Sequence, residues 1–238
     1  MTVAPYSWLM LAGILVSIVF WWRLARRDGR LVWIYIGALL GAFIGAKLAY
    51  FLAEGWLDLG RPDFWLRLAT GKTIIGGLLG GYAGVEIAKR VVKYRGVTGD
   101  WFALIAPLGI ILGRIGCLLH GCCRGIECSP SWFTLRDPSG SERWPAVPAE
   151  MAFNLAALGT FLALRRYRLL PGQHFHLYLI CYGLFRFGHE FLRADRRIAG
   201  PFTGYHAAAL GLVVLGFAGF AIRRKSLRVV LPQVKTAH

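Results

Sequence analysis

Charged residues are scarce in this sequence: 17% of its 238 residues are Asp, Glu, Lys or Arg, whereas 56% are hydrophobic. Together with a mean hydropathy of +0.52, this shortage excludes an ordinary soluble protein and indicates an integral membrane protein. Heptads, low-complexity tracts and solenoid repeats are also lacking, which favours one membrane domain. The first apolar stretch has neither a basic segment before it nor a small-residue cleavage site, so we expect a retained helix rather than a cleaved signal peptide.

The apolar residues gather in seven stretches of spanning or near-spanning length. They predict an all-α, polytopic integral membrane protein with about seven transmembrane helices in a single domain over residues 1–238. The connection at about 120–146 is rich in Pro, Gly, Ser and Trp and is expected to form an outer loop or a small headpiece. The expected helices lie near residues 5–22, 31–53, 73–88, 101–119, 147–164, 174–192 and 204–222.

Acidic residues number only 12 against 28 Lys and Arg, which gives a net charge of +16. The basic residues cluster in every second connection, whereas the other connections balance them with acidic residues. This alternation follows the positive-inside rule and predicts an outside N-terminus and an inside C-terminus. It points to a membrane and argues against binding to nucleic acid. The basic clusters lie at 23–30, 89–95, 165–168 and 223–235.

One predicted helix carries a guanidinium group, Arg114, in an otherwise apolar run. A charge at membrane depth is expensive and marks a functional site by default. The chain then leaves this helix through His120, three cysteines, Arg124 and several glycines. Lys47 and Glu86 are also charged, but we place both near the inner ends of their helices, where their side chains are expected to snorkel to water.

The helix predicted at 174–192 carries Tyr182, Arg186, Glu190 and Arg193 at spacings of four, four and three residues. These spacings put all four side chains on one face, as expected for a helix that lines a wet cavity. An ion pair between Arg186 and Glu190 is the plainer alternative, but the sequence neighbours of Arg114 are apolar. Because guanidinium groups match phosphate oxygens and stay charged when desolvated, the pattern predicts a site for a phospholipid headgroup.

The cysteines allow three interpretations, which the sequence leaves open. Cys117, His120, Cys122 and Cys123 are soft ligands at workable metal spacing, but the paired C-x-x-C elements of common zinc sites are missing. On an oxidising outer face, disulfides among Cys122, Cys123 and Cys128 are a comparable alternative. A thiolate activated by a neighbouring arginine is the third. We predict neither a bound metal nor a cofactor.

Three elements of the chain resemble those of the prolipoprotein diacylglyceryl transferase family, over residues from about 46 to 210. The stretch Gly113-Arg114-Ile115-Gly116, followed by Gly121 and Gly125, is similar to the family signature. Pro145 with Glu150 is similar to a second family element, and the helix from Tyr182 to Arg193 is similar to a third. A glycine-rich turn with Gly76, Gly77 and Gly80 also resembles a family turn, although helix packing is the plainer role for these glycines.

The resemblance implies seven helices, an outside N-terminus and a multi-pass protein of the bacterial cytoplasmic (inner) membrane. It also implies transfer of a diacylglyceryl group from phosphatidylglycerol to a cysteine thiol of a prolipoprotein, at a site facing outward. Arg114 and Arg186 would hold the phosphate, with Tyr182 and Glu190 on the same wall. The residues expected to bind substrate are Gly76, Gly77, Gly80, Gly113, Gly116, Gly121, Gly125, Glu150 and Arg193.

The chain departs from the family pattern on the polar side of the site. A family histidine is replaced by Ile75, two asparagines by Cys117 and His120, and a glutamate by Cys122. We therefore expect a divergent, cysteine-rich member in which His120 acts as the base, or in which Cys117 or Cys122 takes part in catalysis. The alternative is a changed paralogue that binds or moves phospholipid, or that transfers to another acceptor through its own cysteines.

Overall fold

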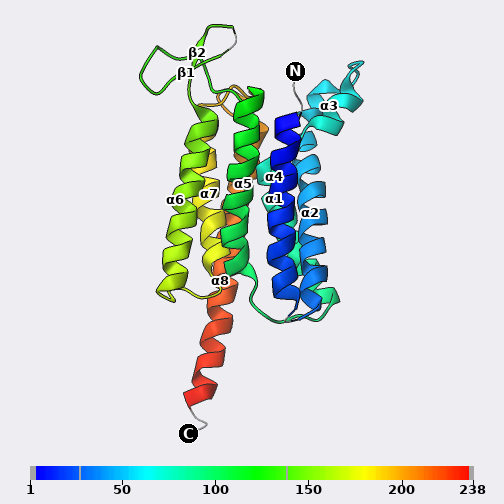
Figure 1. Cartoon of the computed structure of the whole chain (residues 1–238), viewed down its shortest axis with the longest axis vertical. Helices are drawn as coiled ribbons and strands as arrows, with labels where there is room; N and C mark the ends of the chain where they lie inside the picture. Colours follow the sequence, from blue (N-terminus) through cyan, green and yellow to red (C-terminus); the bar gives the residue numbers. More distant parts are fainter. Residues whose placement is uncertain (1–3, 27, 138, 236–238) are drawn as a thin grey trace.

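The computed structural model describes residues 4–26, 28–137 and 139–235. Within them the chain is mostly helical and forms an elongated bundle (Figure 1). Two short helical segments, η1 (Gly55–Asp58) and α3 (Phe64–Thr70), lie at the same end as the N-terminus. The long helices are α1 (Ala4–Ala25), α2 (Arg30–Ala53), α4 (Ile74–Val91), α5 (Gly99–His120), α6 (Ala146–Arg166), α7 (His174–Glu190) and α8 (Gly204–Lys235).

Each apolar stretch predicted from the sequence lies almost entirely within one of these long helices. Among the described residues, four helices are long and apolar enough to cross a membrane: Arg30–Ala53, Gly99–His120, Ala146–Arg166 and the Gly204–Arg224 part of α8. This confirms a mostly helical chain of membrane character. That all seven long helices span a membrane, and in which direction, stays a prediction.

Helices α2 and α4 pack closer together than ordinary side chains permit. Each helix presents three glycines at four-residue intervals to the other. A methyl group on Gly80 would lie 2.1 Å from the carbonyl oxygen of Gly41, and one on Gly45 would lie 2.4 Å from that of Gly76. Small residues at such spacing let two backbones touch within a membrane, where lipid supplies no hydrophobic drive for helix association. The facing glycines are Gly37, Gly41 and Gly45 on α2 and Gly76, Gly80 and Gly84 on α4.

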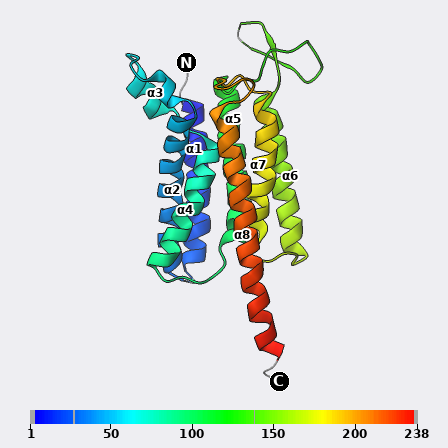
Figure 2. The ribbon, with the colours of Figure 1, turned by 180° about the vertical axis from the view of Figure 1, so that it is seen from behind.

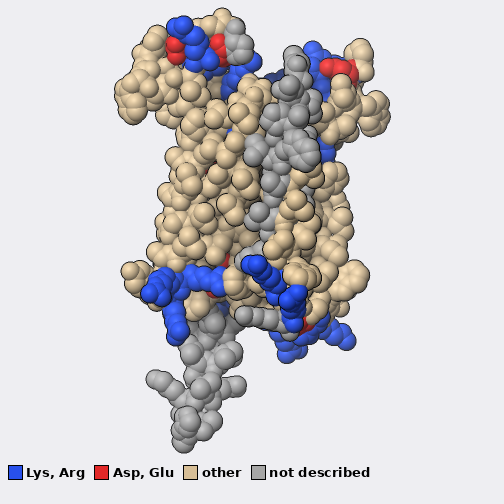
Figure 3. Space-filling view, viewed as in Figure 1, with Lys and Arg blue, Asp and Glu red and all other residues tan. Residues whose placement is uncertain are grey.

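The buried apolar side chains form two clusters. The larger cluster surrounds Tyr178 and Leu179 and is formed mainly by residues of α4, α5, α6, α7 and α8. The smaller cluster surrounds Trp21 and Ile34 and is formed by residues of α1, α2, α4 and α5. Figure 2 shows the first part of α8 running along α7 and the remainder continuing beyond the other helices. Many large apolar residues face outward, and the middle of the molecule is free of charge on the visible face (Figure 3). An apolar surface of this extent is typical of a membrane contact.

The segment between α5 and α6 contains a two-stranded hairpin, β1 (Leu135–Arg136) with β2 (Glu142–Arg143), which an all-helical prediction does not include. The turn forms because a carboxylate oxygen of Asp137 accepts hydrogen bonds from the backbone N–H groups of Ser139 and Ser141, at 2.9 and 3.1 Å. Hydrogen bonds from Ser139 and Arg143 hold the pKa of Asp137 below its usual range. The hairpin projects beyond the helices at the end of the bundle that carries the N-terminus (Figure 1).

Lys47 lies at the opposite end of its helix from the one expected. Its ammonium group donates to the backbone carbonyl oxygens of Leu68 and Gly71, at 3.0 and 2.9 Å, and to that of Ala69. These carbonyls lie at the C-terminal end of α3, which is at the N-terminal end of the bundle (Figure 1). The direction of α2 therefore places Lys47 near α3 rather than near the basic connections.

The α2–α4 contact predicts a sharp difference between two adjacent glycines of α4. Gly80→Ala is expected to lower the free energy of unfolding in detergent by about 1–3 kcal/mol, because its methyl group would overlap the α2 backbone. In the control Gly81→Ala, the nearest atom would lie 3.5 Å away, so stability should stay unchanged or rise slightly. Thermal unfolding followed by circular dichroism measures both, and equal stability of the two variants would contradict the assigned contact.

Candidate active site

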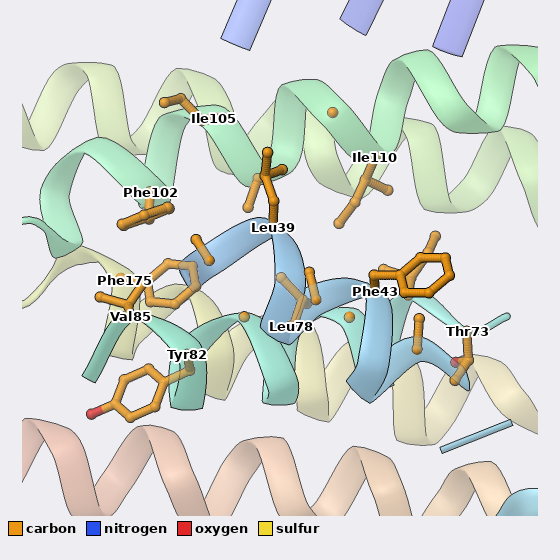
Figure 4. Close-up of a pocket in the computed structure, with 18 of the residues that line it drawn as sticks. Leu39, Phe43, Thr73, Leu78, Tyr82, Val85, Phe102, Ile105, Ile110 and Phe175 are labelled. Atoms are coloured by element: carbon orange, nitrogen blue, oxygen red, sulfur yellow. The ribbon is translucent and has the colours of Figure 1, made fainter. Parts of the chain in front are cut away.

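A large cavity runs through the bundle between α2, α4 and α5. Its volume is about 2060 Å³, more than the roughly 300–1,000 Å³ that is usual for small-molecule pockets. Its middle section is apolar, and Figure 4 shows Leu39, Phe43, Leu78, Phe102 and Ile110 around this space. The cavity therefore suits a ligand with long hydrocarbon chains.

Three buried arginines line one end of this cavity: Arg114 near the end of α5, Arg186 in α7 and Arg193 just beyond α7. Only 4–6% of the surface of each is exposed. This end lies below the hairpin, at the N-terminal end of the bundle (Figure 1). A concentration of buried positive charge at the end of an apolar cavity is what an anionic lipid headgroup requires.

The first arginine is held by a network that joins α5, α6 and α7. Arg114 Nη2 lies 2.6 Å from Glu150 Oε2, and the Tyr182 hydroxyl donates to Glu150 Oε1 at 2.7 Å. Glu150 and Tyr182 are fully buried. Asn154 extends the network by one helical turn: its side chain donates a hydrogen bond to the Glu150 backbone carbonyl and accepts one from the Tyr178 hydroxyl, both at 2.8 Å. Glu150 therefore fixes the position of Arg114, and its direct role in substrate binding stays a prediction.

The second and third arginines share Glu190. Arg186 Nη1 lies 2.8 Å from Glu190 Oε2 in an ion pair without hydrogen-bond geometry, and Arg193 Nε lies 3.7 Å from the same oxygen. The Thr203 hydroxyl donates to Glu190 Oε1 at 2.9 Å, while Arg193 Nε pairs with Asp195 at 2.8 Å. Burial alone would lower the pKa of Arg193, but Asp195 outweighs it and the pKa is raised. The ladder predicted for this helix face is therefore present, with its last member beyond the helix end.

These ion pairs leave guanidinium donors unused. Among the described residues, Arg114 Nε, Arg186 Nε and Arg193 Nη1 are buried and have neither a hydrogen-bond partner nor an ion-pair partner. Buried donors without partners are costly, so each indicates a group that a ligand can satisfy. Phosphate oxygens fit these donors well.

The cysteines come together where α5 ends. Gly121 has a positive φ of 67°, its N–H bonds to the Leu118 carbonyl and the N–H of Cys122 bonds to the Cys117 carbonyl, which is a Schellman motif. This turn folds the chain back, so the sulfur atoms of Cys117, Cys122 and Cys123 all lie within 4.8 Å of one another. Cys123 itself has a φ of 61°, an uncommon conformation for a residue other than glycine.

All five cysteines are free thiols in the structure. Hydrogen bonds from the thiols of Cys117 and Cys122 lower the pKa of Cys123 well below its usual range, and the guanidinium groups of Arg114 and Arg193 act in the same direction. The same three sulfurs and the same arginines line the end of the cavity. The thiol cluster and the arginine cluster are thus two sides of one site.

The remaining predicted residues divide between the cavity and the packing around it. Gly77, Gly113 and His120 line the cavity, and His120 is exposed at its mouth. The other glycines lie elsewhere: Gly76 and Gly80 contact α2, Gly116 is buried in α5, Gly121 forms the turn, and Gly125 packs against the Trp144 backbone. A direct role in substrate binding stays a prediction for these five.

Several residues of the site were not predicted. Cys123 was grouped with the other cysteines but not chosen, because its φ and its arginine neighbours are tertiary features. Asn154 lies one helical turn after Glu150, and this spacing was the available signal. Thr203 and Asp195 lie in a connection without periodicity, so the sequence carried no signal for either.

The fold and the site define a class of protein: a helix bundle of membrane character whose lipid-sized cavity ends in buried arginines and clustered thiols. The sequence profile of prolipoprotein diacylglyceryl transferase matches residues 1–222. The chain belongs to this family and is a diacylglyceryl transferase-like enzyme. No solved structure gives a significant match.

Curated relatives agree with this assignment. The chain is 32% identical over 208 residues to a phosphatidylglycerol–prolipoprotein diacylglyceryl transferase of Pseudoalteromonas atlantica, covering 85% of this chain and 71% of the relative. It is 29% identical to a protein of the same name from Rhodospirillum rubrum, covering 97% of this chain and 93% of the relative. A Clostridium perfringens protein, named as the second such transferase, is 30% identical over 170 residues.

The buried network predicts that the stability of the fold depends strongly on Glu150. Glu150→Gln is expected to destabilise the protein by about 3–5 kcal/mol, because it leaves Arg114 as an uncompensated buried charge. Glu127→Gln is the control: Glu127 also pairs with an arginine, but its side chain is 65% exposed, and the expected loss is below about 1 kcal/mol. Unfolding of both variants in detergent measures this, and similar losses would refute that dependence.

Proposed function

We propose that this enzyme transfers the diacylglyceryl group of phosphatidylglycerol to a cysteine thiol of a prolipoprotein. The observation that carries the proposal is the set of buried guanidinium donors without hydrogen-bond partners at one end of a lipid-sized cavity. The printed names of the relatives supply the substrates. Arg114, Arg186 and Arg193 hold the headgroup phosphate, and the acyl chains occupy the apolar section in Figure 4.

The reaction replaces a carbon–oxygen bond by a carbon–sulfur bond. The acceptor thiol gives up its proton to solvent and its sulfur attacks the carbon of the diacylglyceryl group that is bonded to the phosphate oxygen. That carbon–oxygen bond breaks, and glycerol phosphate departs with the bonding electrons. Negative charge grows on the departing phosphate, and fixed guanidinium groups stabilise that charge without reorganising. Glu150 and Glu190 keep the guanidinium groups in place.

The site is proposed to face outward from the bacterial cytoplasmic membrane, with all seven long helices spanning it. Lys and Arg lie at both ends of the bundle, but at the hairpin end they stand beside Asp and Glu, whereas the opposite end shows few acidic residues (Figure 3). The more basic end takes the inner side under the positive-inside rule. The N-terminus, the hairpin and the arginine cluster then lie on the outer side, where an exported prolipoprotein presents its thiol.

The arginines predict a loss of transfer. Arg114→Ala and Arg186→Ala are each expected to slow release of glycerol phosphate from labelled phosphatidylglycerol by about 10²–10³-fold, since each removes charge stabilisation at the leaving group. Arg136→Ala is the control, because the side chain of Arg136 is 73% exposed on the hairpin. The assay uses purified protein with a peptide that carries a lipobox cysteine.

The wild-type protein decides between transfer and simple lipid binding. A transferase releases glycerol phosphate and forms a thioether that mass spectrometry of the peptide detects. Phospholipid binding without release would instead support the lipid-binding alternative. Arg186→Lys helps to separate folding from function, since it keeps the charge but loses the planar fork that fits phosphate.

The orientation predicts the activity of alkaline phosphatase fusions, which are active only outside the cytoplasm. A fusion after Gly140 in the hairpin is expected to be active, and one after Lys93, between α4 and α5, is expected to be inactive. The reverse pattern would place the active site on the inner side.

A further inference from the structure

The end of α5 and the turn after it bring three of the five cysteines together in one thiol cluster. Cys117 is in the last turn of α5, and the Schellman turn at Gly121 brings Cys122 and Cys123 back over it. All three sulfurs lie within 4.8 Å of one another. They face the cavity that holds the arginines, whereas Cys128 and Cys181 are not part of this group.

We infer that Cys117, Cys122 and Cys123 bind a zinc ion whose fourth coordination position takes the thiol of the acceptor. The inference rests on the proposed function, because it gives the metal a role in that transfer. Zinc is tetrahedral and accepts thiolate ligands, and catalytic zinc sites have three protein ligands with one open position. Three cysteines, with the exposed His120 outside the group, meet this description.

The geometry is close to that of a tetrahedral site. Zinc–sulfur bonds of about 2.3 Å place the sulfur atoms about 3.8 Å apart, and the three thiols are already within 4.8 Å. The helix end and the turn hold the three backbones in place. Rotation of the cysteine side chains would then be enough to bring the sulfur atoms to this separation.

The charges around the cluster also fit. Three thiolates with one divalent cation carry a net charge of −1, which is costly to bury without compensation. Arg114 and Arg193 interact electrostatically with Cys123, and both are buried on the same side of the cavity. Arg114 and Arg193 are each already paired with a carboxylate, but both lie close enough to Cys123 to lower the cost of burying this charge.

A zinc ion would deprotonate the acceptor thiol at a site where the family histidine is absent. The family histidine position is Ile75, which is fully buried in the apolar core. A thiol that coordinates zinc loses its proton, here to solvent, and its sulfur remains a nucleophile. That sulfur forms the bond to the glycerol carbon, the carbon–oxygen bond breaks, and glycerol phosphate leaves. The product thioether is a weaker ligand and dissociates, so the zinc ion is unchanged and no oxidant or reductant is consumed.

Metal content tests the site separately from activity. The full-length protein, purified in detergent with a reductant, loaded with zinc chloride and desalted, is expected to hold one zinc ion per chain by elemental analysis. Cys122→Ser and Cys123→Ser are expected to weaken zinc binding by at least about 10–100-fold, the loss that even outer-shell changes cause at zinc sites. Cys128→Ser is the matched control and should bind zinc as the wild type does.

A wild type that holds no zinc after loading would overturn the site, and so would serine variants that bind zinc as tightly as the control. A wild type whose clustered thiols are joined in a disulfide after purification in reductant would overturn it as well. Circular dichroism of each variant confirms that the helices are intact, so that a loss of zinc is not a loss of fold.

Cobalt tests the open position in the unaltered protein. The thiolate-to-cobalt charge-transfer absorption of the cobalt-loaded wild type should rise by about a third when a fourth thiolate from a lipobox peptide binds. The same peptide with serine in place of cysteine should leave it unchanged. An absorption that does not respond to the cysteine peptide would overturn the acceptor role.

The two proposals fail in different ways. Zinc bound by the cysteines without release of glycerol phosphate would refute the transferase function while leaving the metal site intact. Transfer at the full wild-type rate in zinc-free protein would overturn the metal inference and leave the transferase function standing.

Discussion

The buried contact between Arg114 and Glu150 is the interaction on which the rest of the site depends. It joins α5 to α6, and the Tyr182 hydroxyl extends it to α7. A charge inside a membrane protein is tolerated only when a partner compensates it. Because the carboxylate uses both oxygens, the guanidinium is fixed in direction and keeps its Nε free. The same contact therefore joins the helices and places the guanidinium group that the proposed function uses.

Close packing elsewhere makes room for this network. On one side, the glycine contact brings α2 and α4 together. On the other side, the larger apolar cluster holds the helices from α4 through α8 together. The cavity runs between these parts and ends in the arginines. Gly76 and Gly80 thus shape the molecule through backbone contact, whereas Gly77, on another face of the same helix, lines the cavity.

The cysteines are the part of the site whose interpretation depends most on the tertiary structure. Their interpretation changes when the turn after α5 is known, because it brings three thiols together beside two arginines. Residues that are separate in the sequence become one cluster in the structure. In the proposals above, the arginines hold the lipid phosphate and the clustered thiols activate the acceptor.

The sequence by itself determined the helices and the candidate arginines, because apolar length and a charge within an apolar run are local properties. The ladder from Tyr182 to Glu190 followed in the same way from helical spacing. Only the tertiary structure decided the partner of Arg114, the end of the helix at which Lys47 lies and the meeting of the thiols. Each of these depends on how separate segments pack against one another or turn, and a local sequence pattern does not specify where distant segments meet.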